Sequence, residues 1–130
     1  MMRLLFDTHA LIWWQTGSER LPRKARQALE DRDNEVFFSA ANAFEIAVKW
    51  RLGKLSVADA LIHAFRATLF EQGFQELVIT SEHALAAGRL AKVHGDPFDR
   101  LLIAQALSEQ LTLVSNAELF DRAAVSRLWG

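Results

Sequence analysis

Four short hydrophobic runs divide the chain, and each has the length of a buried β-strand. They cover residues 3–6, 35–38, 76–79 and 111–114, and a further apolar stretch over 125–129 is typical of an edge strand. Hydrophobic residues between these runs recur at helical spacing. This spacing predicts helices over residues 8–17, 22–31, 39–53, 56–73 and 81–93, one that opens at 96–97 and includes 101–106, and a short one over 118–122.

Capping residues agree with this division of the chain. Serines precede three of the predicted helices, at Ser39, Ser56 and Ser81, and glycines close three, at Gly17, Gly53 and Gly73. Strands that alternate with helices form βαβ units, whose strands run parallel. The sequence therefore predicts one α/β domain over residues 1–130, with a central, mostly parallel sheet of four to five strands and helices on both faces.

Composition narrows the class of protein. A chain of 130 residues buries about two-thirds of its unfolded surface, so it can form a core without crosslinks. The absence of cysteine excludes disulfides, thiol nucleophiles and thiolate metal sites, and it suits a reducing cytoplasm. No apolar run approaches the roughly 18 residues that span a membrane, and Asp7 follows the first run too early for a signal peptide. We therefore expect a cytoplasmic, non-membrane protein.

Polar residues follow the predicted strands at the edge where parallel sheets bind ligands. Asp7 follows the first strand, Ser39 the second and Thr80 the third, and Ser115 and Asn116 follow the fourth. Asp7 suits either a functional acid or an N-cap for the next helix, a role that Thr8 can also fill.

Glu45 lies in the helix over 39–53 with hydrophobic neighbours on both sides. It suits a site at the edge of a buried stripe, or an ordinary pair with Lys49 four residues later, which contributes only a few tenths of a kcal/mol.

The segment from Asp96 to Arg100 has the sequence of a helix start, with Asp96 as N-cap, Pro97 in the first turn and Asp99 at the third position. Asp99 stands one turn before Leu102 and Ile103, a position from which its carboxylate can point into a cleft. Carboxylates that converge repel one another unless they share a hard cation, and oxygen ligands of this kind suit Mg²⁺ or Mn²⁺.

The chain resembles the PIN-domain nucleases, and specifically the VapC-like toxins of type II toxin–antitoxin systems. The resemblance covers essentially the whole chain and rests on Leu4–His9, Phe44–Lys49 with Gly53–Leu55, Asp96–Ala106 and Leu113–Asn116, of which the third segment is the most specific.

The resemblance implies a metal site made by Asp7, Glu45 and Asp99, which would also be the catalytic residues. The family's fourth acid falls at Ala117, which is a departure from the pattern, and Asn116 or Glu118 is a candidate to supply the missing oxygen. The implied activity is Mg²⁺- or Mn²⁺-dependent hydrolysis of RNA by a toxin that a small antitoxin neutralises. Family members are usually homodimers.

Further residues have auxiliary roles in this hypothesis. Ser115 or Asn116 would bond a phosphate oxygen or a metal-bound water, and Asp96 would support the metal site. The cations suited to hold RNA are Lys49, Arg51, Lys54 and Arg100. A net charge of −1 argues against a polycationic coat protein, but removing the four clustered acids from the count leaves a basic body.

The four histidines, His9, His63, His83 and His94, lack the spacing of a zinc site. His9 is close enough to Asp7 to contact substrate or to make a structural hydrogen bond. Trp13 and Trp14 are adjacent on a helix and cannot both face one core, so one of them is expected to be exposed.

Two other classes of protein fit the same fold. A non-catalytic binding module is favoured by Ala117, where an acid is expected. A receiver-like phosphoacceptor domain also carries an Asp at a strand end, but here the Asp comes early and no Lys ends a late strand.

Overall fold

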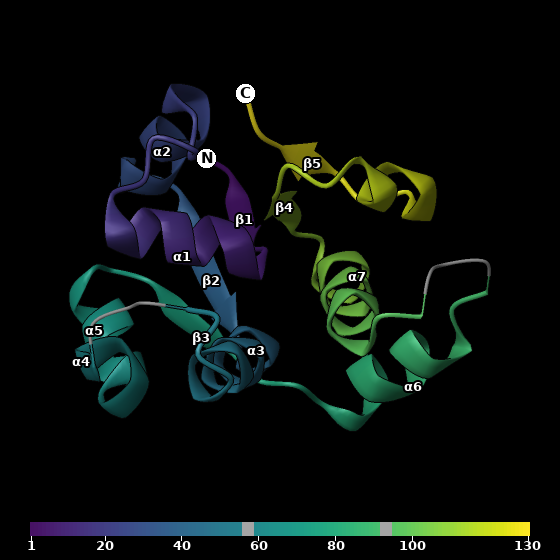
Figure 1. Ribbon diagram of the computed structural model, residues 1–130. Coiled ribbons are helices and arrows are strands. Elements are labelled where there is room, and N and C mark those ends of the chain that lie inside the picture. Colours follow the sequence, from purple (N-terminus) through teal and green to yellow (C-terminus); the bar gives the residue numbers. More distant parts are fainter. Residues whose placement is uncertain (56–58, 92–94) are drawn as a thin grey trace.

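The computed structural model describes residues 1–55, 59–91 and 95–130 (Figure 1). Its strands are β1 (Arg3–Phe6), β2 (Glu35–Ser39), β3 (Gln75–Leu77), β4 (Thr112–Val114) and β5 (Arg127–Leu128). Its helices are α1 (Thr8–Thr16), α2 (Arg23–Glu30), α3 (Ala40–Arg51), α4 (Asp59–His63), α5 (Phe65–Glu71), α6 (Ser81–Arg89) and α7 (Pro97–Glu109), with a 3₁₀ helix, η1 (Glu118–Ala123).

The five strands form one sheet in the order β3-β2-β1-β4-β5, and every neighbouring pair is parallel. β1 is the central strand, and Leu5 pairs with Phe37 of β2 on one side and with Leu113 of β4 on the other. The predicted α/β class and parallel sheet are confirmed, and the apolar stretch near the end of the sequence does provide the edge strand β5.

Alternation along the strands divides the core between the two faces of the sheet. Leu4 and Phe6 belong to a cluster with residues of α1, α2 and α5, whereas Leu5 packs in a second cluster with α7 and η1. Figure 1 shows the same layers, with α1 and α2 on one side of the strands and α7 on the other. The prediction of helices on both faces is therefore confirmed.

Several predicted boundaries are wrong. The third strand ends at Leu77, because the chain then leaves the sheet and the Val78 carbonyl accepts a hydrogen bond from Gln105. The expected single helix over 56–73 divides into α4 and α5, because Ala64 between them has non-helical angles (φ −133°, ψ 43°).

Two helix starts also differ from prediction. Thr80, not Ser81, caps α6: its Oγ1 accepts from the His83 N–H, and its own N–H donates to His83 Nδ1. Pro22 is the N-cap of α2, so that helix begins one residue later than expected. The helix expected to run to about Val93 ends at Arg89, because Leu90 has non-helical angles (φ −58°, ψ 119°). The helix start expected at Ser56, and His94, lie outside the described residues.

Over the described ranges, the protein has no helix that combines the length and hydrophobicity needed to cross a membrane.

Candidate active site

The order of the strands creates a cleft beside Asp7. The chain runs from β1 to β2 to β3 in one direction and then places β4 on the opposite side of β1, so the sheet reverses its order between β1 and β4. The two strand ends are joined there, since the Asp7 N–H donates to the Val114 carbonyl at 3.1 Å. Parallel sheets bind ligands at such a reversal.

A cavity of about 590 Å³ lies at this edge. It draws its lining from α1, α3, the start of α7 and the segment after β4. The lining residues are Asp7, His9, Trp13, Arg20, Glu45, Lys49, Asp96, Asp99, Asn116, Ala117 and Leu119. Four carboxylates that were singled out in the sequence, Asp7, Glu45, Asp96 and Asp99, thus line one space.

Asp7 is 7% exposed and both its oxygens are engaged. Oδ1 accepts from the Thr8 N–H at 2.8 Å as the N-cap of α1, and Oδ2 accepts from the Ser115 hydroxyl at 2.7 Å. Burial raises the pKa of the Asp7 carboxyl above its usual value, and the negative charge of Glu45 adds to the rise, while the two hydrogen bonds and His9 oppose it. Asp7 is therefore both a helix cap and a buried acid whose charged form is disfavoured by burial.

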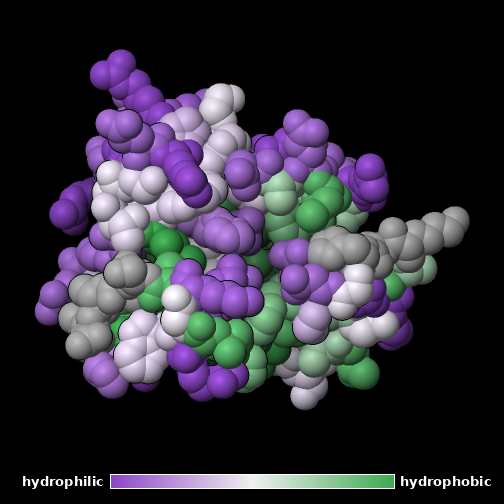
Figure 2. All heavy atoms as spheres, in the orientation of Figure 1, coloured by the Kyte–Doolittle hydropathy of each residue, from purple (hydrophilic) through white to green (hydrophobic). Residues whose placement is uncertain are grey.

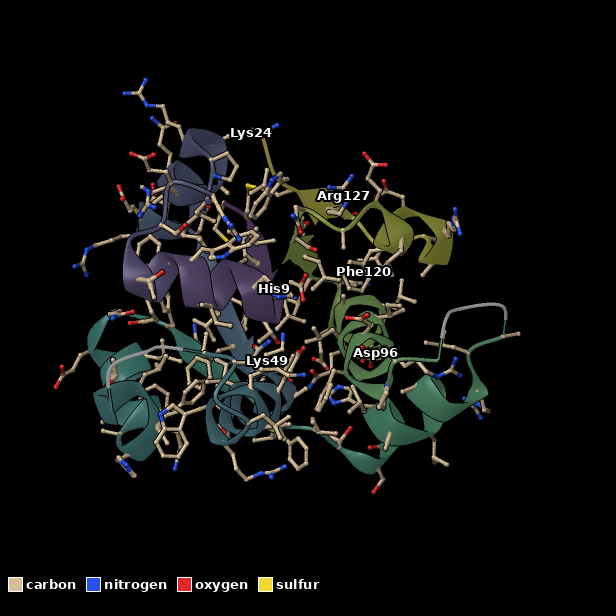
Figure 3. All side chains as sticks on the ribbon, viewed as in Figure 1. His9, Lys24, Lys49, Asp96, Phe120 and Arg127 are labelled. Atoms are coloured by element: carbon tan, nitrogen blue, oxygen red, sulfur yellow. The ribbon has the colours of Figure 1, made fainter. Side chains whose placement is uncertain are left out.

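Glu45 reaches the cavity from α3, and it also forms the ion pair that its spacing suggested. Lys49 Nζ lies 3.2 Å from Glu45 Oε2 and 3.4 Å from His9 Nε2, so the ammonium stands between an acid and an imidazole. Figure 3 shows His9 on α1 and Lys49 on α3 facing each other across this space, with Asp96 at the start of α7. Glu45 therefore both pairs with Lys49 and lines the cavity, so the two roles considered for it are compatible.

Asp96 and Asp99 enter the cavity from the first turn of α7. The predicted N-cap is confirmed: Asp96 Oδ1 accepts from the N–H groups of Phe98 (2.9 Å) and Asp99 (3.3 Å). Capping fixes the direction in which α7 starts, and so fixes the place of Asp99 at the cavity wall.

The segment after β4 positions Asp7 and does not supply a fourth carboxylate to the cavity. Ser115 is buried, and its hydroxyl donates to Asp7 and accepts from the Ala117 N–H at 3.0 Å. The hydroxyl is therefore engaged within the protein, whereas the sequence analysis expected it to bond substrate. Asn116 and Ala117 line the cavity. Glu118 is not among the lining residues, and its charge instead raises the pKa of Arg127, after the stronger effect of Asp121.

The basic residues expected to bind RNA do not all lie at the cavity. Lys49 does. Arg100 turns away from it, and its guanidinium donates to the carbonyls of Ala87 (3.0 Å), Gly88 (3.2 Å) and Leu90 (2.6 Å) at the end of α6. Arg51 and Lys54 are exposed and outside the cavity lining. Arg100 thus joins α6 to the first turn of α7.

Sequence reasoning missed a buried polar network behind the acids. Asn42 Nδ2 donates to the Phe6 carbonyl (3.2 Å) and to Thr8 Oγ1 (3.0 Å), the two residues that flank Asp7. Its Oδ1 accepts from the Ser39 N–H (2.7 Å), and the Ser39 hydroxyl donates to Gln105 Oε1 of α7 (2.6 Å). The only signal in the sequence was a polar residue three positions after Ser39, which suited a capping box at the surface as well as a buried one.

The aromatic residues of α1 were also placed incorrectly. Neither Trp13 nor Trp14 is exposed: Trp14 packs on Phe74, and Trp13 packs on Trp129 and lines the cavity together with Arg20. Because β5 brings Trp129 beside α1, the helix has a second partner that its own periodicity cannot reveal.

The donors around the cavity suit a hard cation in kind. All four acids offer oxygen ligands, which Mg²⁺ and Mn²⁺ prefer, and the buried Asp7 carboxylate is destabilised chiefly by burial and to a smaller extent by the charge of Glu45, a repulsion that a cation relieves. Within the described ranges, however, no three His, Asp or Glu side chains are gathered closely enough to hold an ion. The residues therefore fit a divalent metal by the chemistry of their donors and by lining one cavity, and not by their present spacing.

Residues 4–126 match the family model described as PIN domain, and the chain belongs to the PIN-domain family. This confirms the resemblance drawn from the sequence. Among characterised relatives, Ribonuclease VapC22 of Mycobacterium tuberculosis is 30% identical over 115 residues, which are 88% of this chain and 87% of the relative.

Solved structures share the fold at lower identity. The VapBC2 complex of Rickettsia felis, bound to a DNA fragment from its promoter, contains a chain with a TM-score of 0.71 and 17% identity, covering 99% of this chain and 100% of that one. DNA-bound VapBC of Salmonella typhimurium gives a TM-score of 0.72 at 18% identity, covering 98% of both chains.

Proposed function

We propose that this protein is a metal-dependent endoribonuclease that acts in the cytoplasm as the toxin of a toxin–antitoxin pair. The observation that carries the proposal is the convergence of Asp7, Glu45, Asp96 and Asp99 on one cavity at the reversal of the strand order. The relationship to Ribonuclease VapC22 supports RNA as the substrate.

Asp7 and Asp99 are the proposed principal ligands of an Mg²⁺ or Mn²⁺ ion, with Glu45 directly or through water and Asp96 in support. Such an ion polarises a phosphate and lowers the pKa of bound water. Glu45 is the proposed residue that orients or deprotonates the attacking water. Ser115 holds Asp7 in place, Asn116 is placed to bond a phosphate oxygen, and Lys49 is placed to neutralise the RNA backbone.

Metal addition and removal test the proposal directly. Single-stranded RNA incubated with the protein and Mg²⁺ or Mn²⁺ should be cut, and EDTA should stop cutting until metal is restored. Mg²⁺ at 100 times its dissociation constant should stabilise the fold by about 2.7 kcal/mol, which raises the melting temperature by several degrees. Calorimetry in EDTA and in Mg²⁺ checks the shift. A chain whose melting temperature and RNA products are the same in both buffers would contradict metal dependence.

Ala117 favours the alternative of a weak or inactive PIN-fold binding module, and a substitution separates the two. Ala117→Asp adds a carboxylate to the cavity wall and should lower the Mg²⁺ concentration for half-maximal cleavage by about tenfold, which corresponds to about 1.4 kcal/mol of metal binding. Gln27→Asp adds the same charge on the exposed face of α2 and should leave that concentration unchanged. If neither chain cuts RNA at any metal concentration, the binding module is favoured.

A small antitoxin and a second copy of the chain are the proposed protein partners. Figure 2 shows hydrophobic side chains between α3 and the α6–α7 pair, where Phe44 is 63% exposed and packs its ring on Phe98. Exposed apolar surface of this kind is typical of protein interfaces. The structural similarity to chains of VapBC and other toxin–antitoxin complexes supports an antitoxin partner. The reading frame adjacent to the gene, if it encodes a short DNA-binding protein, is the observation that tests it.

A further inference from the structure

Beside the acids, His9 and Trp13 contribute aromatic rings to the cavity lining, and Trp129 packs behind Trp13. The His9 imidazole lies 5.6 Å from the Trp13 ring at an interplanar angle of 32°, and Trp13 in turn lies 5.7 Å from Trp129 at 53°. His9 is exposed, whereas Trp13 is half-buried. The stack therefore has two half-buried rings, Trp13 and Trp129, behind the exposed His9 ring, which lines the cavity.

Two cationic side chains lie beside these rings. Lys49 Nζ is 3.4 Å from His9 Nε2, and the Arg20 guanidinium lies over the Trp13 ring, 5.9 Å from its centroid. Both side chains line the same cavity as Asp7 and Asp99. The cavity lining thus combines carboxylates with aromatic rings that have cations beside them, and Lys49 lies between Glu45 and His9.

This combination matches the chemistry of a single-stranded nucleotide. A base presents a flat π-face that stacks on aromatic side chains whatever its sequence, and the phosphates on either side of it attract Lys and Arg. The cavity volume of about 590 Å³ falls within the range of roughly 300–1,000 Å³ that small-ligand sites occupy.

We propose that His9, supported from behind by Trp13, is a stacking platform for an unpaired nucleobase next to the bond that is cut, with Lys49 and Arg20 holding the adjoining phosphates. The inference rests on the proposed function, since it deepens the RNA site of that function. It assigns the chain a preference for single-stranded RNA, because a paired base has no free face to offer His9.

The test compares two ligands that differ only in their bases. A fluorescent twelve-nucleotide oligoadenylate RNA and a twelve-unit abasic ribose-phosphate strand carry the same backbone charge. Fluorescence polarisation in EDTA gives a dissociation constant for each, and a gel checks that the strands are intact. The dissociation constant of the abasic strand divided by that of the oligoadenylate measures the contribution of base contacts. Loss of a phosphate contact weakens both strands equally and leaves this ratio unchanged.

His9→Ala should lower this ratio at least about fivefold, the lower end of the effect of removing a stacked base. His9→Phe should keep the ratio, because it retains a flat ring without the imidazole nitrogens. The matched control is His63→Ala, which removes an exposed histidine that also contacts a tryptophan, Trp50, edge-on at 6.1 Å and 83°, but lies outside the cavity lining.

Each other result overturns the inference. If His9→Ala weakens both strands equally, His9 contacts the backbone and not a base. If both constants are unchanged, the aromatic rings serve another purpose, such as contact with a protein partner. If the unmodified chain cuts RNA in Mg²⁺ but His9→Ala does not change the ratio, the stacking platform is refuted and the proposed nuclease activity is not. A chain that neither cuts nor binds RNA refutes both.

Discussion

Asp7→Asn should reduce RNA cleavage by at least about 100-fold while the metal-free variant melts no lower than the unchanged chain. The loss follows because metal polarisation of a phosphate contributes several kcal/mol to catalysis, and each 1.4 kcal/mol is tenfold in rate. The stability should hold because Asn keeps an oxygen to accept from the Thr8 N–H, and because removing a buried charge that the fold disfavours offsets the loss of the bond that the Ser115 hydroxyl donates to Asp7. Initial cleavage rates and calorimetry in EDTA measure the two effects.

The stability difference between the two chains should depend on pH. The folded-state pKa of Asp7 is raised, so the folded chain binds more protons than the unfolded chain between the two pKa values. The unchanged chain therefore loses stability relative to Asp7→Asn as pH rises from about 4, and the difference should shrink toward zero in acid.

Asp33→Asn, which removes an exposed acid before β2, is the matched control for the Asp7 variant and should change neither cleavage nor melting. Equal cleavage by Asp7→Asn and the unchanged chain would remove Asp7 from the site.

Asn42→Ala should destabilise the fold by about 3–5 kcal/mol. The side chain is fully buried, and its loss leaves the Phe6 carbonyl, the Thr8 hydroxyl and the Ser39 N–H without the bonds it makes to them, each at a cost of about 1–3 kcal/mol. At this chain length the melting temperature should fall by about 10 °C or more. Cleavage at low temperature, where the variant is still folded, should also fall, because Phe6 and Thr8 fix the backbone of Asp7.

Gln27→Ala, an exposed substitution on α2, should shift melting by no more than about 2 °C and serves as the control. A melting temperature for Asn42→Ala within that range would show that water or backbone adjustment satisfies the three groups.

The class of fold was predictable because each strand is a separate hydrophobic run whose neighbours are helices. Leu4–Phe6 reads as a strand from local sequence alone, and its burial on both faces follows from a parallel sheet. The end of β3 and the break at Ala64 were not predictable. The end of β3 depends on a contact with a distant part of the chain, the bond from Gln105 to the Val78 carbonyl, and no glycine or proline marks the break at Ala64.

The candidate site was predictable where acids follow strands or open helices. Asp7, Asp96 and Asp99 were found from such positions, whereas Glu45, in the middle of α3, was assigned from the family resemblance; all four line one cavity. Direction of side chains was not predictable: Arg100 sits beside Asp99 in sequence, yet its guanidinium binds the end of α6. Asn42 and Gln105 also escaped notice, because a polar residue within a helix is ordinarily at the surface.

The central position of β1 sets a condition on when the site can exist during synthesis. Asp7 is made first, but its partner Ser115 and the neighbouring strand β4 come more than a hundred residues later. A ribosome that has just completed α3 has made Asp7 and Glu45 without the wall that faces them. The cavity gains its full lining only when α7 and β4 have emerged, so any activity that needs all four acids has to wait for these elements.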